Sequence, residues 1–145
     1  MTSAILHTLT DLAAHEGFFV SGGVDLEPSR ELFKDHFNRY RKWIEEGRHG
    51  TMGYLARGLE RRADPTQLLP TAKSIFAVGY AYPAKIHGIA DIKEGVQYAR
   101  YIRGRDYHLE MSEKLEKIAV QAKKQLQLEF ESKVCVDTSA LLERT

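Results

Sequence analysis

Residues 75–78, with the sequence Ile-Phe-Ala-Val, limit the folds open to this chain more than any other segment does. Consecutive apolar residues of this kind predict a strand that is buried on both faces of a sheet. Because both faces must then be covered, helices have to pack against that sheet. We therefore expect the remaining segments to supply those helices and the neighbouring strands.

Three segments have the apolar spacing of amphipathic helices, namely residues 2–17, 27–47 and 106–130. Thr2 or Ser3 can cap the first helix, and Gly17 ends it. Pro28 suits the first turn of the second helix, and Asp106 can cap the third. The predicted buried stripe of the second helix consists of Phe33, Phe37, Tyr40 and Ile44. The ion pairs predicted on the third helix, in the favourable i,i+4 order, are Glu110 with Lys114 and Glu113 with Lys117.

Further strands are predicted at residues 18–26, 96–104 and 133–136, and Gly22 and Gly23 interrupt the first of them. The order of elements is then helix, strand, helix, strand, strand, helix, strand. This order predicts an α/β (α+β) chain with a single mixed sheet covered by helices. No linker divides the sequence, so residues 1–145 are predicted to form one domain.

The composition excludes several classes of protein. Apolar residues make up 43% of the chain and charged residues 28%, and the formal net charge is +1, so charge alone does not indicate a nucleic-acid binder. Cys135 is the only cysteine, which excludes a disulfide framework and an iron–sulfur cluster held by these residues alone. We recognise neither a membrane span nor an export signal, so the sequence predicts a cytoplasmic protein with no membrane partner.

Asp137 is the first candidate for chemistry because it follows the predicted strand at residues 133–136. Open α/β sheets place ligands beyond the C-terminal ends of their strands. A carboxyl group there, partly shielded from water, can hold its proton near neutral pH and act as a proton donor. The alternative is that Asp137 caps a helix that begins at residues 138–144. The two roles are compatible, since a capping residue can also lie in a site.

Residues 103–108, Arg-Gly-Arg-Asp-Tyr-His, join a predicted strand to a predicted helix N-terminus. Backbone N–H groups at such a junction favour anions, and the two arginines add positive charge. Tyr107 and His108 supply a hydrogen-bond donor and a titratable ring. The alternative is an ordinary surface turn followed by a capped helix.

Arginines are the third candidate group: Arg57, Arg61, Arg62, Arg100, Arg103 and Arg105. Guanidinium groups bind phosphate and carboxylate oxygens well. One basic face built from these residues would contact a nucleic-acid backbone despite the small net charge. The alternative is that these arginines are merely solvated surface charges.

Four segments of the chain, taken together, carry a family resemblance: "HGTMGYLARG" at 49–58, "ERRADPTQLLPTAKSIFAVGYAYP" at 60–83, "YARYIRGRDYH" at 98–108 and "VDTSALLER" at 136–144. In this order they resemble the N-terminal part of epoxyqueuosine reductase. That family removes the epoxide oxygen in the last step of making queuosine in tRNA. The resemblance covers essentially the whole chain.

The resemblance implies an oxidoreductase domain that holds cobalamin and uses Asp137 as the proton donor to the departing oxygen. It also implies that Arg62 and Ala99 contact the cofactor, and that Tyr107 and His108 line the site. The tRNA that carries epoxyqueuosine would dock on a basic rim made of Arg57, Arg61, Arg100, Arg103 and Arg105.

The family continues into a ferredoxin-like domain with two 4Fe-4S clusters, and residues 1–145 contain no such region. The resemblance implies that these clusters, and the electron donor that feeds them, belong to a full-length parent, and that this fragment alone is inactive. An exposed sheet edge at its C-terminus would favour a dimer. A non-catalytic RNA- or ligand-binding α/β module and a purely structural domain are the alternative functions.

Overall fold

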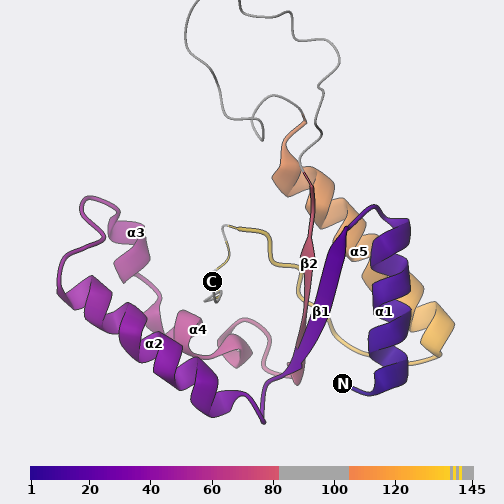
Figure 1. The fold of residues 1–145 in the computed structure, drawn as a ribbon, viewed down its shortest axis with the longest axis horizontal. Helices are drawn as coiled ribbons and strands as arrows, with labels where there is room; N and C mark the ends of the chain where they lie inside the picture. Colours follow the sequence, from indigo (N-terminus) through magenta and orange to yellow (C-terminus); the bar gives the residue numbers. More distant parts are fainter. Residues whose placement is uncertain (82–104, 138, 140, 142–145) are drawn as a thin grey trace, which may run out of the picture. The chain divides into compact units, whose positions relative to one another are not determined.

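The computed structural model describes residues 1–81, 105–137, 139 and 141. The elements in these residues are α1 (Ser3–His15), β1 (Val20–Asp25), α2 (Arg30–Glu45), α3 (Gly53–Ala56), α4 (Leu59–Ala63), a 3-10 turn at Pro65–Gln67, β2 (Ser74–Gly79) and α5 (Tyr107–Leu126), as Figure 1 shows. This mixture of helices and strands confirms the predicted α/β (α+β) class. The predicted strand at residues 96–104 lies outside the described residues.

β1 and β2 pair as a two-stranded antiparallel sheet (Figure 1). The backbone N–H of Phe19 donates to the carbonyl of Gly79 at 3.0 Å, and that of Leu26 donates to the carbonyl of Lys73 at 2.9 Å. β1 runs through residues 22–23 without a break, so the predicted interruption by two glycines is wrong. Pairing with β2 offsets the weak intrinsic preference of glycine for strands.

The strand predicted at residues 75–78 is present as β2, but its predicted burial on both faces and the strand predicted at residues 133–136 are wrong. No residue of β2 is fully buried, because within the described part of the chain its sheet has only one other strand and cannot enclose it. Residues 133–136 form no strand, and Cys135 is half-buried there. A strand needs a hydrogen-bonding partner, and among the described residues none pairs with this segment.

Side-chain caps begin the first and the last of the described α-helices, as predicted. The Thr2 side chain accepts from the N–H of Ile5 at 3.4 Å, and Gly17 after α1 has φ +88°. Asp106 caps α5, as predicted. The second helix begins later than predicted, with Ser29 as its N-cap, so Pro28 lies in the preceding turn instead of the first helical turn.

Of the two ion pairs predicted on α5, only that between Glu110 and Lys114 forms, at 3.7 Å. Glu113 instead pairs with Arg105 at 2.7 Å, and Lys117 pairs with the Glu16 carboxylate at 2.5 Å. Both of these partners lie outside the helix. The second predicted pair is therefore wrong because closer counter-charges from elsewhere in the chain compete for its members.

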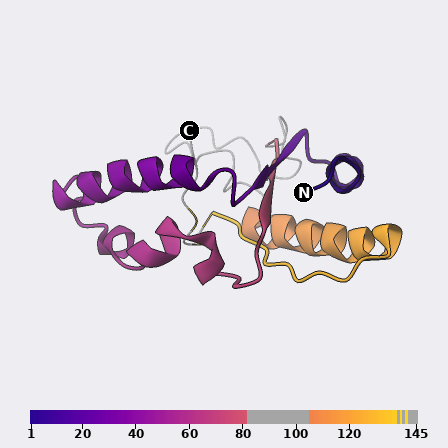
Figure 2. The ribbon, with the colours of Figure 1, turned by 90° about the horizontal axis from the view of Figure 1, so that it is seen from below.

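The chain divides into two compact units, and each contains part of both strands. In the unit formed by residues 2–22 and 77–128, α1 packs against α5: the two helices cross obliquely in Figure 1, and Figure 2 shows α1 end-on beside α5. This unit holds all the buried apolar side chains of the described residues, namely Leu12, Ala13, Phe18, Ile118 and Ala122.

The other unit contains residues 1, 23–76 and 129–145, with α2 packed on α4. None of its described side chains is fully buried, and the stripe predicted as buried on α2 is half-buried. Short helices offer α2 less covering surface than a second long helix would. No helix among the described residues is long and apolar enough to cross a membrane.

Candidate functional site

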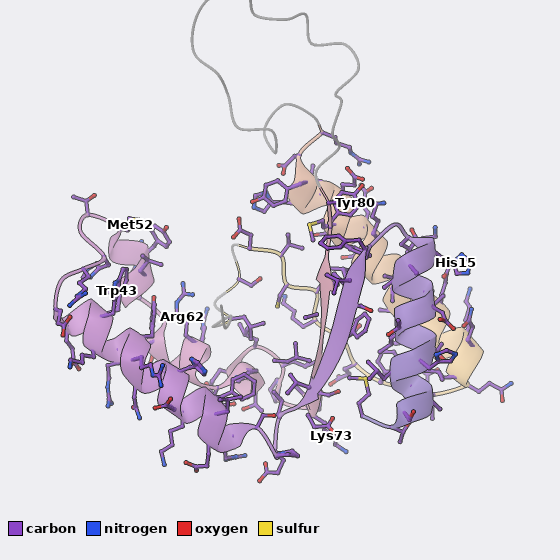
Figure 3. All side chains as sticks on the ribbon, in the orientation of Figure 1. His15, Trp43, Met52, Arg62, Lys73 and Tyr80 are labelled. Carbon is purple, nitrogen blue, oxygen red and sulfur yellow. The ribbon has the colours of Figure 1, made fainter. Side chains whose placement is uncertain are left out.

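The guanidinium group of Arg62 packs over the ring of Tyr40 on α2. Arg62 lies on α4, which follows Gly58 at φ +73°, and its guanidinium carbon lies 5.7 Å from the centroid of the Tyr40 ring (Figure 3). Tyr40 is itself fixed, because its hydroxyl donates to the carbonyl of Leu55 at 2.7 Å. The Arg62 Nε is buried and has no hydrogen-bond partner among the described residues. A buried N–H without an acceptor is costly, so Arg62 is suited to bind an oxygen of a ligand.

The loop after α4 is stabilised by Asp64. Its Oδ1 accepts from the hydroxyl of Thr66 at 2.7 Å and from the Thr66 backbone N–H at 2.9 Å. These two hydrogen bonds, the hydroxyl first, hold the pKa of the Asp64 carboxyl below its usual value. Arg57 at the end of α3 and Arg61 on α4 belong to the same unit and are exposed.

Asp137 lies in the same unit as Arg62, and its side chain is exposed. Its φ of +44° is in the left-handed region, which non-glycine residues seldom adopt. An N-cap residue normally has an extended backbone. No helix is assigned at the described residues 137, 139 and 141, so the structure gives no support to the helix-cap alternative.

Tyr107 and His108 stand at the start of α5, in the other unit. Their rings stack, with centroids 4.1 Å apart, and both side chains are half-buried. The Asp106 carboxylate accepts from the His108 backbone N–H at 2.9 Å and lies 2.9 Å from its Nδ1. These contacts, the backbone hydrogen bond first, lower the pKa of Asp106 and hold the orientation of His108. Arg105 is exposed and pairs with Glu113.

Sequence reasoning missed a polar network around Tyr80, just after β2 (Figure 3). Its hydroxyl donates to Glu110 Oε1 at 2.6 Å, and the Lys114 Nζ lies 4.8 Å from its ring centroid. Lys114 also donates to the carbonyl of Glu16 at 2.7 Å, and the ring of Phe18 packs edge-on at 5.6 Å. The hydrogen bond to Glu110, followed by burial, raises the pKa of Tyr80. The i,i+4 acid and base on α5 were the only signal of this network in the sequence.

The described residues thus place the predicted site residues in two groups. Arg57, Arg61, Arg62 and Asp137 belong to one unit, and Arg105, Tyr107 and His108 belong to the other. Ala99, Arg100 and Arg103 lie outside the described residues. Over the part of the chain that the structure describes, no cluster of His, Cys, Asp or Glu could hold a metal ion.

Comparisons with known proteins agree on one family. The family model described as "Epoxyqueuosine reductase QueG, DUF1730" matches residues 62–138. The epoxyqueuosine reductase of Prochlorococcus marinus is 33% identical over 90% of this chain and 40% of its own length. That of Xanthomonas campestris is 35% identical over 72% of this chain and 30% of its own length. That of Pseudomonas aeruginosa is 25% identical over 97% of this chain and 38% of its own length.

The chain therefore spans about a third of the length of the curated relatives that it matches. No solved structure gives a significant match.

Proposed function

This chain belongs to the epoxyqueuosine reductase family, and we propose that it is the cobalamin-binding and catalytic part of an enzyme that reduces epoxyqueuosine in tRNA to queuosine. The range of the family match is the observation that carries this proposal. The matched residues begin at Arg62 and include Ala99, Tyr107, His108 and Asp137. Every residue proposed to contact the cofactor or to donate the proton thus lies within the match.

The proposed reaction removes the epoxide oxygen as water and leaves a carbon–carbon double bond, which consumes two electrons and two protons. Bound cobalamin would supply reduced cobalt for this chemistry. The two electrons would be supplied by the proposed 4Fe-4S clusters of the complete enzyme and their external donor. The residues of this chain then have to orient the reacting groups and deliver a proton.

Arg62 fits a cofactor that presents hydrogen-bond acceptors. Cobalamin carries amide side chains and a phosphate, and both offer oxygens to a guanidinium group. The side chain is already oriented over Tyr40, and its buried Nε has no acceptor among the described residues. Ligand binding would satisfy this N–H without first having to break another hydrogen bond.

Asp137 is the proposed donor of the proton to the departing oxygen. Its φ of +44° supports a special role, because strained backbone positions cluster at active sites. The side chain is exposed in this structure. The proposed role therefore requires bound substrate and cofactor to cover this carboxyl group and to bring the departing oxygen within hydrogen-bond distance of it.

The tRNA is proposed to dock on basic side chains. Arg57 and Arg61 are exposed and available for phosphate. Arg105 pairs with Glu113 at the surface, and such an exposed pair contributes only about 0–1 kcal/mol. Exchanging that carboxylate for a phosphate therefore costs little.

Cobalamin binding by the purified chain tests the proposal. We expect the cofactor to co-elute with the protein on gel filtration and to change its visible spectrum. Arg62→Ala should lower the ratio of cobalamin to protein. Arg61→Ala, which removes an exposed arginine from the same helix, should leave that ratio unchanged. Equal retention by both variants would contradict the role of Arg62, and no binding at all by the original chain would count against the cofactor.

A further inference from the structure

A shallow depression of about 280 Å³, largely open to solvent and called the hollow below, lies beside the C-terminal half of α2, in the unit that contains α2 to α4. Its lining residues are Arg39, Lys42, Trp43, Glu46 and Arg48. Small-molecule sites are concave and bury most of their ligand, whereas this open depression can cover only one side of a bound group. It suits one group of a larger molecule and is too small for a corrin ring. None of the residues assigned above to the cofactor, the proton or the basic rim lines this hollow.

Cations dominate the lining of the hollow. Lys42 lies 4.0 Å from the Glu46 carboxylate, and the Arg48 Nε donates to the same carboxylate at 2.6 Å. Arg39 pairs at 3.0 Å with Asp35, which lies outside the lining. All three basic side chains are more than half exposed, so these pairs contribute little to stability. Each cation can therefore exchange a carboxylate for a phosphate oxygen at low cost.

Trp43 adds a fixed aromatic wall. Trp43 is labelled in Figure 3. Its ring stacks on that of Tyr40, with centroids 6.0 Å apart and an interplanar angle of 21°. The ring of His49 packs on it at 6.3 Å. Tyr40 is anchored in turn by its hydrogen bond to Leu55. The indole is thus held in place while part of it stays accessible from the hollow, and a held ring loses little entropy when a ligand packs against it.

We infer that this hollow is an RNA contact site, in which Arg39, Lys42 and Arg48 bind phosphate oxygens and an unstacked base packs against Trp43. Single-stranded RNA is commonly bound in this way, by basic side chains that follow the backbone and aromatic side chains that stack on bases. An acidic peptide would satisfy the cations, but unless it carries an aromatic side chain it offers no ring to stack on the indole. The inference rests on the proposed function for one point only, namely that the polyanion bound at the hollow is RNA.

Trp43 is the only tryptophan in the sequence, so tryptophan fluorescence, excited at a wavelength that the seven tyrosines do not absorb, reports on this residue alone. The 145-residue chain is titrated with an RNA hairpin that has an unpaired loop. Blunt duplex RNA, heparin and phosphatidylserine vesicles serve as comparison ligands. We expect the hairpin to quench the fluorescence, with an affinity that falls as salt rises. Blunt duplex and heparin, which lack exposed bases, should bind more weakly and quench less.

Matched variants distinguish RNA binding at the hollow from non-specific attraction of RNA to positive charge elsewhere on the protein. Lys42→Ala should weaken hairpin binding and reduce the slope of log affinity against log salt by about one. Lys124→Ala removes the same charge from the exposed last turn of α5 and should change neither quantity. Trp43→Ala, followed by the anisotropy of labelled RNA, should weaken binding roughly fivefold or more. Circular dichroism checks that each variant is folded. If Trp43→Ala does not fold, the test of the inference rests on Lys42→Ala.

The inference is overturned if the hairpin binds without a change in fluorescence, or if Lys42→Ala and Lys124→Ala weaken binding equally. It is also overturned if heparin or the vesicles bind as tightly as the hairpin, because bases would then contribute nothing to affinity. Finally, it is overturned if the hairpin does not bind. These failures leave the proposed function standing, because cobalamin binding and its dependence on Arg62 are measured without RNA.

Discussion

Asp137 is the single residue on which the proposed proton transfer depends. Asparagine has nearly the same shape but no carboxyl proton to donate. In the complete enzyme proposed above, Asp137→Asn should therefore lower epoxide reduction by about a hundredfold or more and leave the cobalamin content unchanged. Turnover is measured by mass spectrometry of nucleosides from digested tRNA.

Glu129→Gln is the control for this prediction, because it neutralises an exposed carboxylate in the same segment and should leave turnover intact. Near-normal turnover by Asp137→Asn would contradict the proposed role of Asp137 as proton donor. A simultaneous loss of cobalamin would point instead to a role in binding the cofactor.

At the scale of elements, Tyr80 connects the end of β2 to α5 through its hydrogen bond to Glu110. Tyr80→Phe removes only the hydroxyl and should lower the free energy of unfolding by roughly 1–3 kcal/mol near neutral pH, since the acceptor is charged. The measurement is denaturant unfolding of both proteins, followed by circular dichroism.

The same variant makes a prediction about pH. The pKa of Tyr80 is raised in the folded state, so the folded protein favours the protonated hydroxyl. The stability it contributes is full below the ordinary tyrosine pKa of about 10 and is lost as pH rises through the higher folded value. The difference in stability between the original protein and Tyr80→Phe should therefore shrink above pH of about 10. A constant difference up to the alkaline limit of folding would contradict this account.

The elements also mark where sequence reasoning succeeds. Thr2 and Asp106 were predicted correctly as caps because each bonds a backbone group within three residues. The strand at residues 133–136 and the burial of residues 75–78 on both faces were wrong, because both depend on partners far away in the chain.

The candidate site shows the same division. Arg62 and Asp137 were identified because their sequence segments resemble those of a known family. Neither the contact of Arg62 with Tyr40 nor the exposure of Asp137 can be predicted from the neighbouring sequence. The hydrogen bond between Tyr80 and Glu110 joins residues 30 positions apart, and no local pattern specifies such a pairing.

On the scale of the whole molecule, the two units differ in how much apolar surface they bury. Ile118 and Ala122 are 2% and 0% exposed, whereas no described side chain in the unit that contains α2 is fully buried. Local opening is easiest where few apolar contacts are lost. Hydrogen exchange followed by mass spectrometry should therefore show faster exchange in α2 than in α1 and α5.

Ile118→Ala sharpens this prediction, because it opens a cavity in the better-buried unit at a cost of roughly 2–5 kcal/mol. It should accelerate exchange in α1 and α5 together, since the two helices pack on each other. Val120→Ala, a truncation at an exposed position of the same helix, should change exchange little. If α2 exchanged as slowly as α5 in the original protein, burial among the described residues would not be what sets local stability, and cover for α2 would have to come from outside them.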